Sequence, residues 1–429
     1  MNINEFLFFL MDIKLYKILT TKYRSKDLDV FLNEVASESL IDYILSRKDS
    51  FYKSFKIKKK NGSYRNINEP LNQLFSIQKE FSLFFLVNRT KYEHSHGFEL
   101  NKSIVTNAKE HVNKKIVLNI DLENFFLNIS TSRIVGFLTT KFNVSETKAI
   151  KIADLLTYKN SLPQGSPSSP IISNFICEKL DLELYKYCRR FNITYTRYAD
   201  DMSFSFSFDK LPKFQVNNII SIIKQNGFKI NKAKYRYYYR NTRQIVTGLV
   251  VNEKVNVKRE FYKNLRAILY NWNSKGIEVA QNKFFEKHGE NKNFILTVAG
   301  WINFLGQVQG KDSDKFISLK SQFKKLEEET KYTRTFNFDS SIPINLSELK
   351  TVLGIPTINL HILKDNNGIE TNFLRYWDVK RRIAILFKKD LFVNLKDNPE
   401  LSILVEESIK DGKDGKYLML LVKKYNLLL

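Results

Sequence analysis

Cysteine is almost absent from this chain, whose 429 residues include only Cys177 and Cys188. The two lie eleven positions apart in a segment predicted to be helical. At about 1.5 Å of rise per residue they are separated by roughly 16 Å, too far for a disulfide bond. No zinc-binding spacing and no cysteine–histidine catalytic pair is visible. This usage suits a reducing compartment, so we expect a cytoplasmic location.

Long apolar runs and acidic residues are also scarce. The apolar stretch FLFFLM near the start is followed by Asp12 and is too short to cross a bilayer, so we expect a soluble protein with no membrane partner. Lys and Arg number 69 against 45 Asp and Glu, a net charge of +24. A compositional habit of the genome can account for part of the lysine but not for the shortage of acids. The excess favours nucleic acid as the partner.

Hydrophobic patterning predicts a mixed α+β protein. An apolar stripe runs along residues 26–47, and Asn61 with Gly62 joins two strand-like runs, a signal for a β-hairpin. Further helices are predicted over residues 71–85, after Ser145, from Ser168 or Ser169 through both cysteines, up to about Asn226, and in three stretches over 259–272, 276–289 and 293–306. Strands are predicted through residues 235–252, and the pattern from about Tyr332 is mixed.

The stretch RYADDMSFSFSF places two adjacent aspartates, Asp200 and Asp201, in a predicted hairpin. Three phenylalanines alternate with three serines after them, the pattern of a strand with one buried face. One interpretation is an ordinary turn, because aspartate is common in turns. The other is that the hairpin presents carboxylates to a hard cation such as Mg²⁺.

A third carboxylate, Asp121, ends the predicted strand KIVLNID. The ends of different strands can converge at one edge of a sheet. Two Mg²⁺ ions about 3.5 to 4 Å apart, held by such carboxylates, serve phosphoryl transfer from a nucleoside triphosphate. Asp121 alone fits a surface turn equally well, so the order of the surrounding motifs is needed to decide.

That order resembles the reverse transcriptases. NIDLENFFLNI is similar to the family's first metal-binding motif, LPQGSPSSP to the loop and helix beneath the nucleotide, and YADD to its aspartate hairpin. NGFKINKAK follows at the place of the next motif, and KIKKKNGSYRNINEP upstream resembles the hairpin that covers the triphosphate. The resemblance implies an RNA-directed DNA polymerase with a right-hand fold, in which fingers, a palm of antiparallel sheet with helices, and a helical thumb precede a C-terminal extension.

The implied domains follow the motifs. They are an N-terminal helical segment over 1–50, fingers over 51–115 and 143–160, palm over 116–142 and 161–252, thumb over 253–330, and an extension over 331–429. The extension has no recognisable nuclease or protease pattern. Its basic, aromatic stretch FLRYWDVKRRIAILFKKDLF fits either extra RNA contacts or a docking face for an effector protein.

The resemblance also implies roles at the catalytic centre. Asp121 and Asp200 correspond to the principal ligands of two Mg²⁺ ions, for which Mn²⁺ can substitute, with Asp201 as the supporting acid. Lys234 corresponds to the proton donor to pyrophosphate, although a lysine in so basic a chain also fits a solvated surface position.

Nucleotide contacts are implied at further positions. Phe126 corresponds to the aromatic residue that excludes a ribose 2′-hydroxyl, with core packing as the alternative. Gln164 and Gly165 correspond to residues beside the incoming deoxynucleoside triphosphate, where glycine permits close approach. Lys59 and Arg65 correspond to the residues that hold the β and γ phosphates, with the register open because three lysines are consecutive at 58–60.

Two motifs narrow the resemblance to the retron reverse transcriptases of bacteria. Asn107 and His111 form an NAxxH pattern, and Val246, Thr247 and Gly248 form a VTG pattern. Singly, these fit a core histidine and a strand end. Together they imply family motifs for RNA binding in an enzyme that copies a structured non-coding RNA, primes from a guanosine 2′-hydroxyl of that RNA, and makes a branched RNA–DNA hybrid (msDNA) used in anti-phage defence.

Other interpretations stay open. The run of tyrosine and arginine from Tyr235 to Arg240 fits either base stacking or packing on the thumb. The chain also fits another defence-associated or group II intron-like reverse transcriptase, although no maturase or HNH region is recognisable. A catalytically dead RNA-binding scaffold is disfavoured by the intact aspartates and Gln164.

Overall fold

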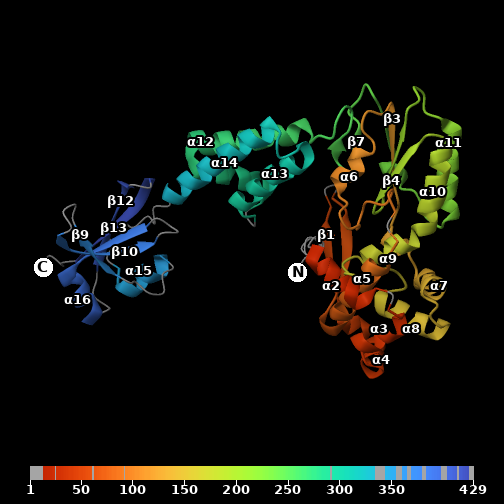
Figure 1. Ribbon diagram of the computed structural model, residues 1–429, viewed down its shortest axis with the longest axis horizontal. Coiled ribbons are helices and arrows are strands. Elements are labelled where there is room, and N and C mark those ends of the chain that lie inside the picture. The colour runs from red at the N-terminus through yellow and green to blue at the C-terminus, as the bar shows by residue number, and fades with distance from the viewer. Residues whose placement is uncertain are drawn as a thin grey trace. The chain divides into compact units, whose positions relative to one another are not determined.

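The computed structural model describes the chain over most of its length. The described residues are 13–24, 26–59, 62–90, 92–289, 292–333, 344–353, 360–364, 369–378, 383–397, 403–412 and 415–424. The stretch FLFFLM, residues 60 and 61, and parts of the C-terminal extension lie outside them. The chain forms two compact units, Met1–Arg259 and Glu260–Leu429 (Figure 1).

The first unit begins with helices, of which α2 packs on α5. They are α2 (Ile13–Tyr23), α3 (Leu28–Val35), α4 (Glu38–Ser46) and α5 (Asn72–Asn88), with the 3₁₀ turn η1 (Lys48–Phe51) before the first strand. The prediction of one helix over 26–47 is wrong, because the backbone is extended at Ala36 and Ser37. The Ser37 hydroxyl accepts a hydrogen bond from the N–H of Leu40 and so caps α4.

The hairpin predicted around Gly62 is confirmed. Strands β1 (Tyr52–Lys58) and β2 (Tyr64–Pro70) are antiparallel with an unbroken register. Gly62 has a φ of 83°, a conformation that costs glycine little. The hairpin is largely exposed to solvent and leads directly into α5.

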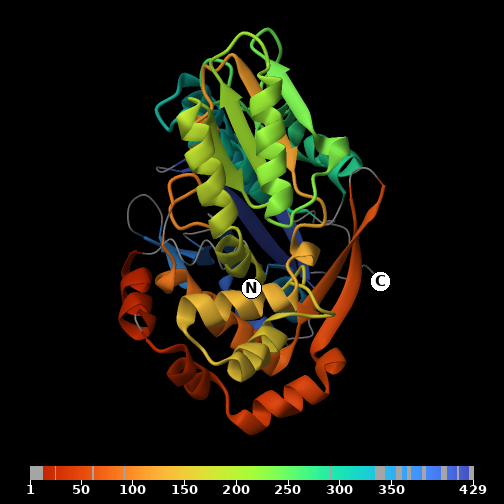
Figure 2. The ribbon, with the colours of Figure 1, turned by 90° about the vertical axis from the view of Figure 1, so that its right-hand side faces the viewer.

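A four-stranded antiparallel sheet in the order β4–β5–β3–β6 lies at the centre of this unit. Its strands are β3 (Ile116–Asp121), β4 (Thr194–Tyr198), β5 (Asp201–Phe206) and β6 (Arg236–Tyr239). One face is apolar, and Leu118 and Phe204 lie opposite each other on it. Figure 2 shows α10 (Glu178–Arg190) and α11 (Lys213–Gln225) lying across that face.

The opposite face of the sheet is polar. It carries a row of register partners that includes Thr196, Ser203 and Asn119. Helix α6 (Ile104–Lys109) and the hairpin of β7 (Ile245–Val246) and β8 (Leu249–Val250) pack over this side. The sheet is therefore enclosed between two layers, as Figure 1 shows.

Because the sheet is covered on both sides, the prediction that β5 has only one buried face is wrong. Ser203 and Ser205 are as buried as Phe204 and Phe206, because α6 covers the serine side. The buried hydroxyls have hydrogen-bond partners: Ser203 donates to Asn119, and Ser205 bonds with His111. Phe208, the third alternating phenylalanine, lies beyond the strand and is 43% exposed.

The remaining elements of this unit are helical. They are α7 (Thr131–Phe142), α8 (Glu146–Leu156), α9 (Ser169–Ile176) and the 3₁₀ turns η2 (Phe126–Asn128) and η3 (Lys232–Lys234). The helix predicted after Ser145 is confirmed as α8, and Pro170 lies in the first turn of α9 as predicted. The long helix predicted through both cysteines is instead divided into α9 and α10, because ψ at Cys177 is −5° and departs from helical geometry. Both cysteines are buried and free.

Within the described residues, the second unit begins with three long helices and continues with a mixed sheet that has two shorter helices. The three long helices are α12 (Arg259–His288), α13 (Phe294–Gln309) and α14 (Asp314–Thr333). Two of the predicted helical stretches belong to α12, which is interrupted at Gly276 with a φ of 82°. No helix among the described residues is long and apolar enough to cross a membrane.

The mixed pattern predicted for the C-terminal extension corresponds to a five-stranded sheet in the order β12–β13–β11–β10–β9. Its strands are β9 (His361–Lys364), β10 (Glu370–Asp378), β11 (Ile383–Lys388), β12 (Ile403–Gly412) and β13 (Gly415–Lys424), with helices α15 (Leu346–Leu353) and α16 (Lys389–Asp397). Strands β11 and β13 are parallel, and the other neighbours are antiparallel. Ile385, Phe387 and Leu420 belong to its core.

Candidate active site

Two aspartates from the two inner strands of the four-stranded sheet face each other at one end of these strands, which we call the Asp edge of the sheet. Asp121 is the last residue of β3 and Asp201 the first of β5, and they are direct register partners. Asp200 lies in the turn before β5, and its carbonyl accepts a hydrogen bond of 3.0 Å from the N–H of Leu122. Asp121 is buried, whereas Asp201 is exposed. The three carboxylates predicted to converge therefore do lie at the Asp edge.

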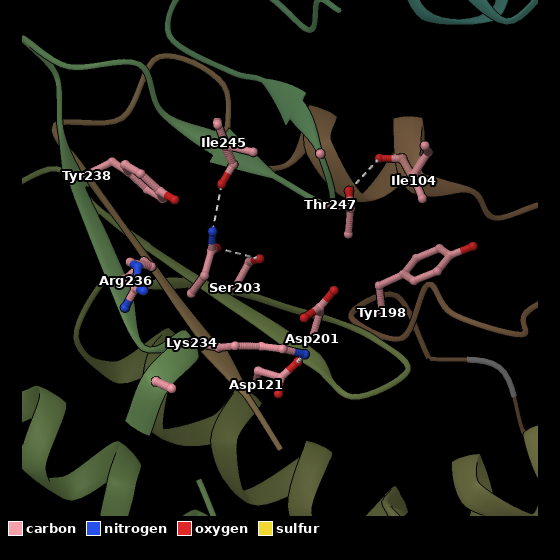
Figure 3. A pocket seen from close by; sticks show the side chains of 13 residues that line it. Ile104, Asp121, Tyr198, Asp201, Ser203, Lys234, Arg236, Tyr238, Ile245 and Thr247 are labelled. Carbon is pink, nitrogen blue, oxygen red and sulfur yellow. Dashed lines mark hydrogen bonds and ion pairs between the residues drawn. The ribbon is translucent and has the colours of Figure 1, made fainter. Parts of the chain in front are cut away.

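Asp121 is held by a lysine and an asparagine from the segment that contains η3. Nζ of Lys234 lies 2.7 Å from Oδ2 of Asp121 (Figure 3). Nδ2 of Asn231 donates to Oδ1 at 3.1 Å, and its backbone N–H donates to the Asp121 carbonyl at 2.8 Å. Asn231 was missed in the sequence, although an asparagine two residues before Ala233 is a turn signal, and its side chain does accept from that N–H.

Burial and repulsion between neighbouring carboxylates together raise the pKa of two of the aspartates. Desolvation raises the pKa of Asp200 and Asp121 raises it further, against the opposing effects of Lys234 and Arg65. Although part of Asp201 is exposed, desolvation of its carboxylate and the charges of Asp200 and Asp121 raise its pKa to about 7. Desolvation lowers the pKa of Lys234, but the aspartates outweigh it and the net shift is upward. The site therefore favours binding of cations.

Asp121, Asp201 and Lys234 border a cavity of about 410 Å³. Strands β3, β5 and β6, the η3 turn, α6 and the β7–β8 hairpin all contribute to its wall. The lining residues, drawn in Figure 3, are Ile104, Asn119, Asp121, Tyr198, Asp201, Ser203, Ala233, Lys234, Arg236, Tyr238, Ile245, Thr247 and Gly248. Two of the three predicted catalytic aspartates, Asp121 and Asp201, thus share one cavity with Thr247 and Gly248 of the VTG motif, whereas Asp200 does not line it.

The donor set at this cavity suits a hard divalent ion, because carboxylate oxygens are the ligands that Mg²⁺ prefers. Among the described residues, however, no three Asp, Glu, His or Cys side chains are gathered as a ready metal site. Both carboxylate oxygens of Asp121 are engaged, one by Lys234 and one by Asn231. An ion at Asp121 would therefore compete with Lys234 and Asn231 for the carboxylate oxygens or share these oxygens with them.

The LPQGS loop lies against the β1–β2 hairpin. The N–H of Asn68 donates to the Gln164 carbonyl at 2.7 Å, and a Cβ on Gly165 would lie 2.9 Å from the Asn68 carbonyl oxygen. Gly165 also has a φ of 123°, so glycine is required there for backbone reasons alone. Ser166 donates to the buried side chain of Gln78 at 2.5 Å. The nucleotide contacts of Gln164 and Gly165 stay a prediction.

The other predicted nucleotide-binding residues lie around the same region. Lys59 and Arg65 are exposed on the β1–β2 hairpin, and Arg65 is near enough to lower the pKa of Asp200. Phe126 is half-buried in η2, with its ring 5.2 Å from that of Phe125. It therefore contributes to packing while keeping part of its ring open, and both predicted roles remain compatible with its position.

The NAxxH residues lie inside the protein. Asn107 and His111 are completely buried, so neither can touch RNA directly in this structure. His111 bonds with Ser205 at 2.8 Å and with Thr196 at 2.7 Å, which joins β5 to β4. Burial lowers the pKa of His111 to about 3. A role of these two residues in RNA binding stays a prediction, and because both are buried that role would be indirect.

The VTG motif lies beside the NAxxH helix. Val246 is fully buried, and the Thr247 hydroxyl donates to the Ile104 carbonyl at 3.1 Å. Thr247 and Gly248 both have positive φ values, 45° and 86°. The two retron-like motifs, far apart in the sequence, therefore meet in the fold.

The tyrosine-rich run forms β6, which pairs with β3 at the edge of the central sheet. Tyr237 is 48% exposed and Tyr239 is 39% exposed, while Tyr238 and Arg236 line the cavity. The run is thus part of this sheet, which leaves base stacking by its exposed rings as a prediction.

Comparisons with known proteins agree with this arrangement. A family described as reverse transcriptase (RNA-dependent DNA polymerase) matches residues 57–292. The retron Ec86 reverse transcriptase of Escherichia coli is 32% identical over 281 residues, which cover 65% of this chain and 82% of that protein. The retron Mx162 reverse transcriptase of Myxococcus xanthus is 33% identical over 254 residues, 51% of this chain and 52% of its own length.

Solved structures give more distant matches. Telomerase from Candida albicans, in complex with a TWJ fragment of telomeric RNA, has a TM-score of 0.40 and 13% identity, covering 76% of this chain and 71% of that one. A foamy viral protease-reverse transcriptase in complex with double-stranded DNA has a TM-score of 0.32 and 14% identity, covering 68% and 48%.

Proposed function

We propose that this chain, which belongs to the retron-type reverse transcriptases and is an RNA-directed DNA polymerase, copies a structured non-coding RNA. DNA synthesis would start from a 2′-hydroxyl within that RNA. The product would be a branched RNA–DNA hybrid used in anti-phage defence. Its partners would be that RNA as template and primer, the RNA–DNA hybrid, deoxynucleoside triphosphates and an effector protein.

The observation that carries the catalytic part is the pairing of Asp121 with Asp201 across β3 and β5, with Asp200 in the adjoining turn. The sheet register holds two carboxylates at the Asp edge irrespective of the mobility of exposed loops. Burial raises the pKa of Asp200 and Asp201, and the charges of the neighbouring aspartates raise it further. A cation bound between the carboxylates would relieve that repulsion.

We assign Asp121 and Asp200 as the ligands of two Mg²⁺ ions, or of Mn²⁺ in their place, with Asp201 in support. Such ions stabilise the attacking and leaving oxygens of an in-line phosphoryl transfer. Lys234, released from Asp121, would then be free to give its proton to the departing pyrophosphate. Its raised pKa keeps it protonated until that point.

The remaining residues would select and hold the nucleotide. Lys59 and Arg65 on the β1–β2 hairpin would hold the β and γ phosphates, and Phe126 would exclude a ribose 2′-hydroxyl. Gln164 and Gly165 would contact the incoming nucleotide. Backbone and 2′-hydroxyl contacts to the RNA are the expected use of a net charge of +24.

The domain assignment follows from these roles. The β1–β2 hairpin and its helices act as fingers, the four-stranded sheet as palm, and α12 to α14 as thumb. The sheet from β9 to β13 adds either RNA contacts or an effector-docking face. The VTG hairpin beside the catalytic cavity is suited to hold the RNA that supplies the primer.

The product of the enzyme tests the proposal. The protein is expressed with its flanking genomic DNA, and the nucleic acid bound to it is treated with RNase and a debranching enzyme. A discrete single-stranded DNA whose mobility shifts on debranching is expected. DNA without a branch would move the chain to another defence-associated type, and RNA alone would support the dead scaffold.

A catalytic control separates synthesis from binding. Asp200→Asn removes one charge but keeps the shape of the side chain. We expect DNA synthesis to be lost while RNA binding, measured by gel shift, stays within about twofold of wild type. Synthesis at the wild-type rate would rule out the metal-ligand role of Asp200.

A further inference from the structure

The turn that carries Asp200 has an unusual backbone. Ala199, which precedes Asp200, has a φ of 56°, in the left-handed region that residues with side chains rarely adopt. Such a conformation persists only where its surroundings hold it. The contacts that hold this turn therefore decide where the Asp200 carboxylate lies.

One of these contacts comes from the side chain of Arg197. Its guanidinium donates to the Ala199 carbonyl at 3.1 Å and is paired with Asp181 at 2.6 Å, with both side chains fully buried. It also donates to Asn174 at 3.1 Å. The carbonyl side of the turn is thereby anchored to α9 and α10.

The other contact is the backbone of residues 94–97, which runs beside β4. The N–H of Arg197 donates to the His94 carbonyl at 2.8 Å, and the N–H of His96 donates to the Arg197 carbonyl at 2.8 Å. Gly97 comes next and is buried directly against the turn. Its own carbonyl accepts a hydrogen bond of 2.9 Å from Asn174.

The close approach at Gly97 leaves no room for a side chain. A Cβ there would overlap with the backbone nitrogen of Ala199 and lie 2.9 Å from the carbonyl carbon of Tyr198. Both are backbone atoms that cannot rotate away. Gly97 has no positive φ, so this contact, and not its own conformation, is what requires glycine.

We propose that Gly97 is a positioning residue of the polymerase site: because it has no side chain, residues 94–97 can lie against the Ala199 turn and hold Asp200 at the Asp edge of the sheet. The inference rests on the proposed role of Asp200. Any side chain at position 97 pushes the turn away from β4, and the displacement passes to the next residue, Asp200. A shift of about 1 Å in a catalytic group costs on the order of 100-fold in rate.

The test is Gly97→Ala in the full chain, with Gly136→Ala as the matched control, because a Cβ at Gly136 would meet nothing within 4 Å. Primer extension is measured on a preformed RNA template with a DNA primer, after titration of active enzyme. For Gly97→Ala we expect kcat to fall about 100-fold. RNA affinity should stay close to that of wild type, while the Mg²⁺ concentration for half-maximal rate rises. The overlap should also lower the midpoint of thermal unfolding, so kcat is measured at a temperature where the variant is folded. Gly136→Ala should retain wild-type kcat.

Two results would overturn the inference: a wild-type kcat in folded Gly97→Ala, or a loss of RNA affinity that accounts for the whole loss of rate. If Gly97→Ala does not fold, Asn174→Ala is the second variant, since it removes both the donor to the Gly97 carbonyl and an acceptor of Arg197, and so loosens both contacts that hold the turn. It should lower kcat about tenfold at unchanged RNA affinity, and an unchanged kcat would count against the proposal. Activity of Asp200→Asn would contradict the proposed function, whereas an inactive Asp200→Asn beside a fully active Gly97→Ala would contradict only the role of Gly97.

Discussion

Nζ of Lys234 lies 2.7 Å from Oδ2 of Asp121, where it neutralises the most buried carboxylate of the cavity. A lysine in this place has two consequences. It competes with a divalent ion for Asp121, and it is close enough to the reaction to give up a proton once displaced. Competition for Asp121 would weaken Mg²⁺ binding, whereas proton donation would speed synthesis, so the two effects can be measured separately.

Lys234→Met should therefore lower the Mg²⁺ concentration needed for half-maximal activity while it slows synthesis. Loss of a general acid costs about 100-fold or more in kcat. Steady-state primer extension over a Mg²⁺ titration measures both quantities. Lys232→Met, on the same turn and exposed, is the control and should change neither. A higher Mg²⁺ requirement in Lys234→Met would contradict the competition.

Phe126→Ala should relax the choice between deoxyribonucleotides and ribonucleotides. The ring is only half-buried, so its open part can exclude a 2′-hydroxyl, and its removal frees that space. We expect the ratio of kcat/KM for dNTP over rNTP to fall at least about tenfold. Leu127→Ala, at an exposed neighbouring side chain, should keep the ratio. An unchanged ratio in Phe126→Ala would leave the ring with a packing role only.

The buried His111 should make stability depend on pH. Its pKa is about 3 in the folded protein, whereas the unfolded chain takes up the proton near pH 6.5. The contribution of neutral His111 to the free energy of unfolding is therefore fully present above pH 6.5. It is lost as the pH falls toward 3, by up to about 1.4 kcal/mol per pH unit.

Urea unfolding of His111→Gln between pH 4.5 and 7.5 tests this expectation. The variant loses hydrogen bonds to Ser205 and Thr196, so it should be about 1 to 3 kcal/mol less stable at pH 7.5, with a flatter pH dependence below pH 6.5. The exposed His361→Gln serves as the control. A pH slope equal to that of wild type would show that His111 does not titrate in this way.

Asp181→Asn should destabilise the protein strongly. It leaves the fully buried Arg197 without its charge partner, a change that costs about 3 to 5 kcal/mol. Asp209→Asn is the matched control, because Asp209 pairs with Lys115 at 2.8 Å on the surface and should cost under about 1 kcal/mol. Chemical denaturation compares the two. Equal costs would mean that burial of the Arg197 pair is not what matters.

The sequence by itself determined several local elements and the chemical character of the site, although two predicted helices, over 26–47 and through both cysteines, are each divided in the structure. The hairpin at Gly62, the helix after Ser145 and the acids at strand ends follow from residue preferences that act over a few positions, and those positions were correctly predicted. The order of motifs was enough to identify a reverse transcriptase with a right-hand fold, since the family match covers residues 57–292.

The tertiary structure decided what depends on contacts between distant segments. Ser203 and Ser205 looked solvent-facing because alternation cannot show that α6 covers their side of the sheet. Likewise, no local pattern shows that Asp121 and Asp201 are register partners, that Asn231 holds Asp121, or that Gly97 lies against Ala199. These contacts join segments that are distant in the chain, as Asn231 and Asp121 are, 110 residues apart, and the preferences of single residues do not determine how such segments pack.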